Sequence, residues 1–197
     1  MPYNPIIHHR KSIRLKGYDY SQAGLYFITI CCQNRECLFG NIQNGEMIVN
    51  DAGKMIENEW IHLKKRFPNI ELHEFVTMPN HFHGILEIVV PPVGATLVVA
   101  QNDNTAQNDN TAHNNEKGQP QGFAPTGKTI GDMMDAFKSI TTVEYIRGVK
   151  TLGWQPFNRK LWQRNYWENI IRTENDYLRI ATYINNNPQQ WEKDSLK

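Results

Sequence analysis

The architecture of this chain is clearest in IELHEFVTMPNHFHGILEIVV, which occupies residues 70–90. It holds two runs rich in β-branched and aromatic residues, at 70–78 and 81–90, joined by a Pro-Asn pair. Such runs are typical of β-strands. Because the connection between them is only two residues long, we expect the second strand to lie beside the first. A Pro-Pro pair follows and ends the second run. We therefore predict two neighbouring strands in this part of the chain.

Upstream of these strands, the sequence predicts one strand, a short hairpin and one helix. Residues 24–34, GLYFITICCQN, have the composition of a buried strand, and the hairpin follows with Gly40 and Gly45 at its turns. The helix spans 51–67, with Asp51 as its expected N-cap and a proline directly after it. Apolar residues recur in it at helical spacing: Met55, Ile56, Trp60 and Leu63.

Downstream, the sequence predicts a helix, a strand and a last helix. The first helix covers 129–147, and the strand is LWQRNYWENIIR at 161–172. The last helix begins at a capping pair, Thr173 and Asp176, and ends at Pro188, which also disfavours helical angles in the residue ahead of it. The order strand, helix, strand, strand, helix, strand, helix predicts an α+β, ferredoxin-like sandwich, with helices packed on an antiparallel sheet.

One segment does not fit this pattern. Residues 93–127 are rich in Asn, Gln, Gly and Pro, and QNDNTA at 101–106 is repeated at 107–112. Because the segment has so little to bury, we expect a flexible, low-complexity insertion. Residues 1–92 and 128–197 would then form a single domain, as a chain of 197 residues allows.

Composition indicates a reduced protein of the cytoplasm. Three cysteines, two of them adjacent, cannot form a disulfide framework, so we expect free structural thiols. The N-terminus lacks an apolar leader, and no run approaches the roughly 20 apolar residues of a membrane span. We therefore predict a cytoplasmic protein with no membrane partner. Its formal net charge is only +1, so a nucleic-acid partner has to be recognised from local clusters of Lys and Arg.

His81 and His83 are the first candidate site residues. They are separated by one residue on a predicted strand, so both side chains leave by the same face while Phe82 packs behind them. Two imidazoles so placed can reach one metal ion. The same pattern also arises by chance at a polar strand edge, and the spacing alone leaves both interpretations open.

Tyr183 and Asn187 form a second polar pair, four residues apart on the predicted last helix. At that spacing they lie on one side of the helix beside its apolar stripe, where a docked helix can offer side chains to the sheet. Arg179 lies one turn before Tyr183 on the same flank. A tyrosine of a terminal helix is otherwise a half-buried packing residue, and the spacing does not exclude that role.

Residues 145–167 contain no acidic residue and interleave cations with aromatic side chains. Aromatic faces stack on unpaired bases and cations follow the phosphates, so this mixture is typical of single-strand nucleic-acid binding. The alternative is that some of the aromatics, Trp162 or Trp167 above all, belong to the core. A further basic cluster lies near the N-terminus. We predict nucleic-acid contacts from Arg10, Lys11, Arg14, Arg147, Lys150, Arg159, Lys160, Trp162, Arg164, Tyr166 and Arg179.

Three motifs, taken together and in this order, resemble the single-tyrosine transposases of the HUH class, and the REP-associated tyrosine transposases in particular. They are MPNHFHGI at 78–85, LWQRNYWENIIR at 161–172 and ATYINNNP at 181–188. The likeness extends from about Arg10 through Trp191, apart from the insertion at 93–127.

The resemblance implies a metal-dependent transposase that cuts and rejoins single-stranded DNA at hairpin-containing repeats. It implies that Tyr183, on a C-terminal catalytic helix, is the nucleophile that forms a 5′-phosphotyrosine bond, since Tyr177 has no amide four residues on. His81 and His83 would bind Mg²⁺ or Mn²⁺, and Asn187 would supply a third ligand where many relatives have Gln. The partner would be single-stranded hairpin DNA, and the protein a monomer or a homodimer.

Two other functions fit the residues without the resemblance. One is a ferredoxin-like nucleic-acid-binding module that regulates without cutting. The other is a metal hydrolase in which His81 and His83 hold zinc and activate water. Attachment of Tyr183 to a DNA 5′ end distinguishes the transposase from both.

Overall fold

A four-stranded antiparallel sheet forms the centre of the fold. The computed structural model describes Leu15 and residues 17–89 and 128–197. Neighbouring strands run in opposite directions in the order β4-β5-β1-β6. Their bounds are Gly24–Cys31 for β1, Ile70–Thr77 for β4, His81–Ile88 for β5 and Trp167–Ile171 for β6. The two strands predicted within 70–90 are therefore confirmed, and they pair with each other as β4 and β5.

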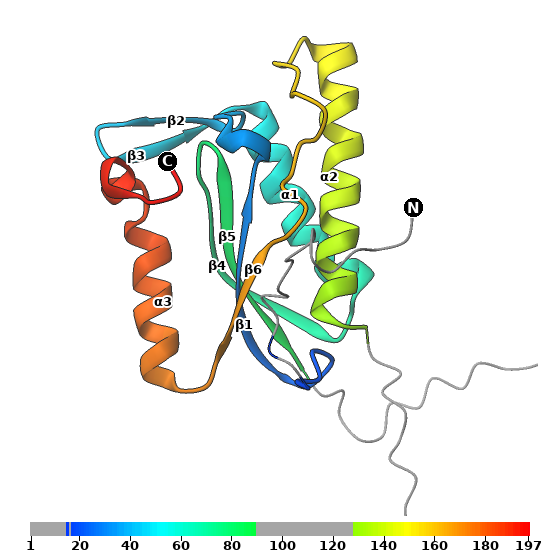
Figure 1. The fold of residues 1–197 in the computed structure, drawn as a ribbon, viewed down its shortest axis with the longest axis vertical. Coiled ribbons are helices and arrows are strands. Elements are labelled where there is room, and N and C mark those ends of the chain that lie inside the picture. Colours follow the sequence, from blue (N-terminus) through cyan, green and yellow to red (C-terminus); the bar gives the residue numbers. More distant parts are fainter. Residues whose placement is uncertain (1–14, 16, 90–127) are drawn as a thin grey trace, which may run out of the picture. The chain divides into compact units, whose positions relative to one another are not determined.

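Helices cover both faces of this sheet (Figure 1). Helices α1 (Asp51–Arg66) and α2 (Ile130–Leu152) pack on one face and against each other, while α3 (Glu174–Asn186) packs on the opposite face. The elements up to β6 follow the ferredoxin-like order, which confirms the α+β class, and α3 adds a third layer. None of the described helices is both long and apolar enough to cross a membrane.

Short elements complete the described chain. A two-stranded hairpin, β2 (Gly40–Gln43) and β3 (Glu46–Val49), stands where it was predicted. Two 3-10 helices, η1 (Gln33–Arg35) and η2 (Pro188–Lys193), follow β1 and α3. The predicted insertion at 93–127 lies outside the described residues, but strands from before and after it share the one sheet.

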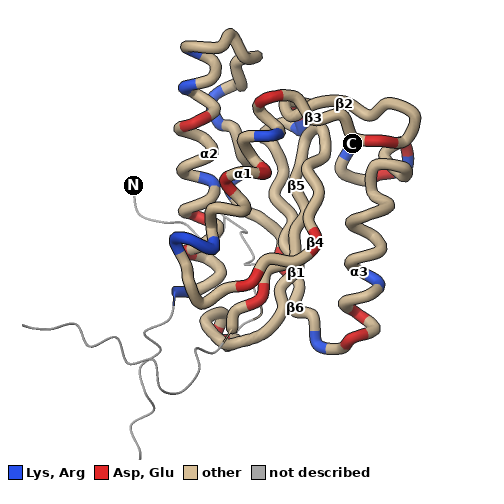
Figure 2. Tube along the Cα trace, turned by 180° about the vertical axis from the view of Figure 1, so that it is seen from behind, with Lys and Arg blue, Asp and Glu red and all other residues tan. Residues whose placement is uncertain are grey.

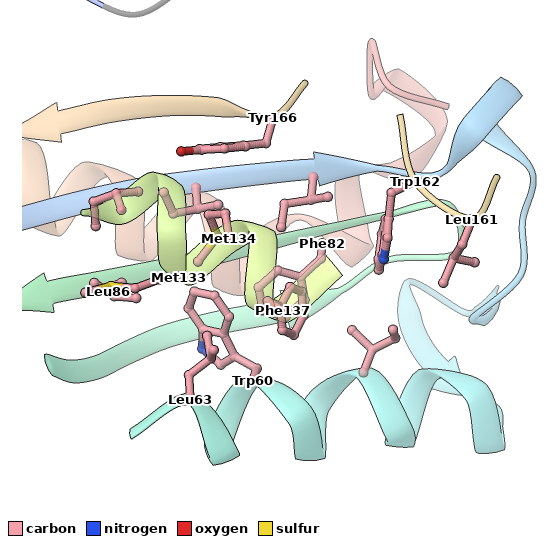
Figure 3. Close-up of a cluster of buried hydrophobic side chains, with 14 of the residues drawn as sticks. Trp60, Leu63, Phe82, Leu86, Met133, Met134, Phe137, Leu161, Trp162 and Tyr166 are labelled. Atoms are coloured by element: carbon pink, nitrogen blue, oxygen red, sulfur yellow. The ribbon is translucent and has the colours of Figure 1, made fainter. Parts of the chain in front are cut away.

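The main core lies between the sheet and the α1/α2 layer, and aromatic rings dominate it (Figure 3). Alternate residues of β1 point into it, and Tyr26, Ile28 and Ile30 are all fully buried. The Trp60 ring of α1 meets Phe82 of β5 at a centroid distance of 4.8 Å and Phe137 of α2 at 5.5 Å. A smaller apolar cluster, made of Ile85, Ile171, Ile180, Ala181 and Ile184, holds α3 on the other face.

The predicted start of α1 and the predicted start of the last strand are wrong. The N-cap of α1 is Asn50, not Asp51, because Asn50 has extended backbone angles and its side-chain oxygen accepts the Gly53 N–H at 2.9 Å. The strand predicted at 161–172 shrinks to β6, because the residues before it turn inward and bury Leu161 and Trp162 in the main core. Burial of apolar side chains thus overrides the strand propensity there.

Helix α2 is longer than predicted and continues to Leu152. It ends at Gly153, whose φ of 71° lies in the left-handed region that glycine adopts readily. Its start and the start of α3 carry threonine caps, with Thr129 accepting the Asp132 N–H and Thr173 accepting the Asp176 N–H. The capping pair predicted for the last helix is therefore confirmed.

We expect Gly84→Ala to destabilise the fold by about 1–3 kcal/mol, because a Cβ there overpacks the core. The added atom would lie 2.7 Å from Trp60 Cζ2 and 2.9 Å from Phe82 Cε1. Urea denaturation measures the loss, and Ser139→Ala, on the exposed side of α2, is the control that should stay within about 0.5 kcal/mol of wild type. An alanine variant as stable as wild type would contradict the packing described here.

Candidate active site

His81 and His83 lie on the face of β5 that α3 covers, and both are buried. Each ring is fixed by a hydrogen bond at Nδ1. His81 Nδ1 lies 2.7 Å from Asn80 Oδ1, and His83 Nδ1 lies 2.8 Å from Oγ1 of Thr29, its register partner on β1. Because the amide oxygen of Asn80 only accepts, the Nδ1 of His81 carries the proton, which leaves Nε2 with a free lone pair. The Nδ1 bonds thus turn both Nε2 atoms toward the site.

Burial keeps these imidazoles neutral. It lowers the pKa of His81 to about 4, although the nearby Asp194 carboxylate and Asn187 amide act in the opposite direction. Burial, with a smaller contribution from His81, also holds the pKa of His83 well below its usual range. Near pH 7 both rings are therefore uncharged, which is the form that binds metal ions. The contact between His81 and Asp194 is accordingly not an ion pair.

Asp194 is the site residue that the sequence did not indicate. It follows η2, and the side chain is 5% exposed. Its Oδ1 accepts the Leu196 N–H at 2.7 Å, while Oδ2 lies 3.6 Å from His81 Nε2 and has no hydrogen-bond partner among the described residues. Ligand atoms of His81, His83 and Asp194 all lie within 4.8 Å of one another, so this buried group could hold a metal ion.

Asn187 reaches the same place from the end of α3. It is buried, and its Oδ1, like His81 Nε2, has no hydrogen-bond partner in the part of the chain that the structure describes. Its backbone keeps helical angles, φ −57° and ψ −43°, so the expectation that Pro188 moves it out of the helical region is wrong. The chain runs on into η2 instead, and that continuation carries Asp194 back to the histidines.

Tyr183 lies over this group on α3 and is 39% exposed. Its Oη is 3.3 Å from His83 Nε2, and the two rings meet edge to face at a centroid distance of 5.3 Å. Burial raises the pKa of Tyr183, Asp194 adds to the rise, and Asn187 opposes it. At neutral pH the phenol therefore keeps its proton, and its hydroxyl shares a hydrogen bond with His83 Nε2.

Tyr177 and Arg179, also on α3, contact acidic side chains outside the histidine group. Tyr177 donates its hydroxyl to Glu74 at 2.7 Å, which, together with some burial, raises the pKa of Tyr177 to about 12. The Arg179 guanidinium pairs with Asp176 at 3.4 Å, although Arg179 lines the same pocket as Tyr183.

A pocket of about 520 Å³ adjoins Tyr183 and His83. Strands β1 and β6 and helix α3 contribute to its lining, which includes Phe27, Thr29, Trp167, Asn169, Arg179 and Ile180. The Phe27 ring stacks on His83 at a centroid distance of 5.3 Å, so the pocket and the histidine group are continuous.

Two of the predicted nucleic-acid contacts need correction. Trp162 and Tyr166 are buried in the main core, so neither ring face is free to stack on a base. Trp162 also donates its indole N–H to Thr141 Oγ1 at 2.9 Å, because a buried indole needs a partner. Trp167, which the sequence allowed as a core residue, is instead 46% exposed.

Apart from Arg179 on α3, the predicted cations that the structure describes lie on the surface of α2 and of the loop after it. Arg147 and Lys150 are exposed on the last turns of α2, and Arg159, Lys160 and Arg164 are exposed in the loop that follows. Figure 2 shows α2 and its Lys and Arg residues across the sheet from α3. Arg147 pairs with Glu144 at 2.9 Å. The N-terminal group Arg10, Lys11 and Arg14 lies outside the described residues.

Comparison with known proteins shows one that is similar in fold and one that is similar in sequence. No protein-family model matches the chain. A solved REP-associated tyrosine transposase bound to a REP hairpin has a similar fold, with a TM-score of 0.51 over 90% of this chain and 74% of that one. The two sequences are 17% identical, so the likeness concerns the fold.

A Haemophilus influenzae protein described as uncharacterized is a much nearer relative. It is 43% identical to this chain over 197 residues, which cover 98% of this chain and 96% of the relative. The chain belongs to the same family as this Haemophilus influenzae protein, and its fold is of the kind found in the REP-associated tyrosine transposase.

Proposed function

We propose that the protein is a metal-dependent transposase and single-strand DNA endonuclease that cuts and rejoins DNA through a 5′-phosphotyrosine bond. The observation that carries this proposal is the position of Tyr183, whose Oη lies 3.3 Å from Nε2 of a buried, neutral histidine. A fold shared with a REP-associated tyrosine transposase supports it.

The donor set at this place fits a divalent cation. Three buried atoms lack hydrogen-bond partners among the described residues: His81 Nε2, Asn187 Oδ1 and Asp194 Oδ2. Unpaired buried lone pairs are costly, and a cation would satisfy all of them at once. Two imidazoles with amide and carboxylate oxygens suit Mn²⁺ or Mg²⁺, and Asp194 joins the expected ligands His81, His83 and Asn187. A cation held there would polarise the phosphate and offset its charge during the reaction.

Cleavage requires Tyr183 Oη to attack the phosphorus atom of the DNA backbone. The new bond joins Oη to phosphorus, and the bond to the 3′ oxygen breaks with its electron pair going to that oxygen. The phenolic proton leaves to water, because a bound cation would occupy the lone pair of His83, and the departing 3′ oxygen takes up a proton from water. Attack by another 3′ hydroxyl on the phosphotyrosine reverses the step and rejoins the strand.

The proposed site takes all of these groups from one subunit. Tyr183 meets His83 of its own chain, so the proposed site needs no exchange of the last helix between subunits. Substrate reaches the tyrosine from the adjoining pocket, where the phenol is exposed. Unpaired DNA suits this entrance better than duplex, because a single strand can place one phosphate against the phenol.

A zinc hydrolase is the second candidate, favoured by the His81, His83 and Asp194 group. Two histidines and one carboxylate form a known catalytic zinc set, and the metal there activates water. In that enzyme the phenol of Tyr183 would not become bonded to product. The two functions therefore differ in whether Tyr183 becomes covalently bonded to the product.

We expect Tyr183→Phe to abolish a covalent protein–DNA adduct that the wild-type protein forms with single-stranded hairpin oligonucleotides and Mn²⁺. Loss of the nucleophile should lower adduct formation by roughly a thousandfold or more. Denaturing gel electrophoresis with 5′- and 3′-labelled DNA measures it. Tyr177→Phe is the matched control, because that hydroxyl binds Glu74 and should leave adduct formation intact.

The same experiment separates the other functions. Metal-dependent DNA turnover that survives Tyr183→Phe would establish the hydrolase. Hairpin binding by the wild-type protein without any adduct or turnover would establish a binding module.

We expect Asp194→Asn to weaken Mn²⁺ binding by roughly 10- to 100-fold, since it removes a charged oxygen ligand. In metal-free buffer the same variant should be more stable by up to about 1 kcal/mol, because it removes a buried carboxylate oxygen that has no partner. Calorimetric titration with Mn²⁺ and urea denaturation in the presence of a chelator measure the two effects. Glu192→Gln, an exposed acid in η2, is the control. Unchanged Mn²⁺ affinity in Asp194→Asn would exclude Asp194 as a ligand.

We expect the exposed cations after and at the end of α2 to bind phosphates of folded single-stranded DNA. The triple variant Arg147→Ala, Lys150→Ala and Lys160→Ala should reduce the slope of log affinity against log salt by about 2. Fluorescence anisotropy of a labelled hairpin measures this slope between 50 and 200 mM salt. The affinity of DNA-binding proteins falls steeply over that range. Lys54→Ala with Lys65→Ala on α1 is the control. Equal affinity of the wild-type protein for hairpin and intact duplex would contradict single-strand preference.

A further inference from the structure

A row of side chains crosses the sheet on the face that α3 covers. Thr29 of β1 pairs in register with His83 of β5 on one side and with Trp167 of β6 on the other. Register partners on neighbouring strands point to the same face of the sheet. The Trp167 side chain therefore lies on the face that carries His83, not on the face of the main core. Strands are about 4.8 Å apart, which puts the backbone of Trp167 about 10 Å from that of His83.

The next row supplies an unengaged polar group. Phe27 pairs in register with Ile85 on β5 and with Asn169 on β6. The Asn169 side chain is exposed, lines the pocket and makes no hydrogen bond to any residue that the structure describes. A free amide offers a donor and an acceptor together, which is what the edge of a nucleobase requires.

The pocket between these rows and α3 therefore combines aromatic surface with sparse polar groups. Phe27 and Trp167 give flat apolar surface, Asn169 gives hydrogen bonds, and Arg179 brings a cation to the opposite wall. Trp167 is exposed to 46%, and a tryptophan left so exposed in a pocket is a platform for stacking. Tyr183, the proposed nucleophile, stands at the border of the same pocket.

We propose that this pocket binds the unpaired base of the nucleotide next to the cleaved bond, with Trp167 stacking on the base and Asn169 contacting its edge. The proposal rests on the proposed function. A phosphate held at Tyr183 and His83 would bring the base of the adjoining nucleotide next to this pocket. A base in a duplex has its pairing edge occupied, so the pocket selects a base that is unpaired. Trp167 and Asn169 are thus specificity residues, while Tyr183 performs the chemistry.

The test compares DNA with and without bases, in the Tyr183→Phe protein so that nothing is cleaved. The probes are four single-stranded homopolymers, each of one base, and an abasic strand of equal length and backbone. Addition of Trp167→Ala should weaken binding of the homopolymers by roughly 5- to 150-fold and leave binding of the abasic strand unchanged. Trp167→Phe should retain most of the affinity, because it keeps an aromatic face. Addition of Asn169→Ala should narrow the differences in affinity among the four homopolymers.

Leu178→Ala is the matched control, since Leu178 is an exposed apolar residue of α3 that does not line the pocket. If Trp167→Ala weakens the homopolymers and the abasic strand by the same factor, or weakens neither, Trp167 does not stack on a base and the inference is overturned.

The result is independent of the cleavage reaction. A base-dependent loss in Trp167→Ala, combined with no adduct in the protein that retains Tyr183, would keep the base pocket and reject the transposase. Adduct formation with no base-dependent loss would keep the transposase and reject the base pocket. Failure of every single strand to bind would reject both.

Discussion

The alternation of side chains along β5 is the constraint on which the site depends. Phe82 and Leu86 point into the main core, while His81, His83 and Ile85 point to α3. A shift of one residue in the pairing of β5 would exchange the two sets, burying imidazoles among the aromatic rings of α1 and α2. The large apolar residues of the core thus fix which face receives the histidines. The register of β5 with β1 also places Thr29 against His83.

In the metal-free protein, the site lowers the stability of the fold locally. Burial removes water from His81, Asn187 and Asp194, and each keeps one polar atom without a partner among the described residues. A buried imidazole costs less free energy when it is neutral than when it is charged. Burial therefore lowers the pKa values of both histidines. The apolar cluster that docks α3, and the hydrogen bonds of Asn80 to the backbone at Arg35 and Leu196, keep these atoms close together nonetheless. Such local instability is typical of sites selected for binding rather than for stability.

Much of this arrangement follows from short-range sequence patterns. The strand alternation around Phe82 placed two histidines on one face, and the helical spacing of Tyr183 and Asn187 placed them on one side of α3. Patterns of this kind depend on residues within one or two turns of each other, which a sequence displays directly. The antiparallel sheet followed from the order of the elements.

Other features depend on contacts across the fold, and the sequence did not display them. Asp194 is one acid in a polar tail, and only the turn of η2 brings it to His81. The aromatic residues near Trp162 had the composition of a binding strand, yet the space between the sheet and α2 takes that ring and leaves Trp167 outside. Which of the two tryptophans is buried depends on tertiary packing, because the local sequence does not distinguish them.

The separation of the surface cations from the tyrosine has a consequence for the shape of any DNA that touches both. The cations at the end of α2 and Tyr183 on α3 lie on opposite sides of the sheet, and β6 is at one edge of that sheet. A strand that contacts both would have to bend from one side of the sheet to the other. Duplex DNA, with a persistence length of about 150 base pairs, resists so tight a turn, whereas unpaired nucleotides make it easily. The thickness of one β-sheet would then set the spacing between DNA bound at the cations and DNA bound at Tyr183.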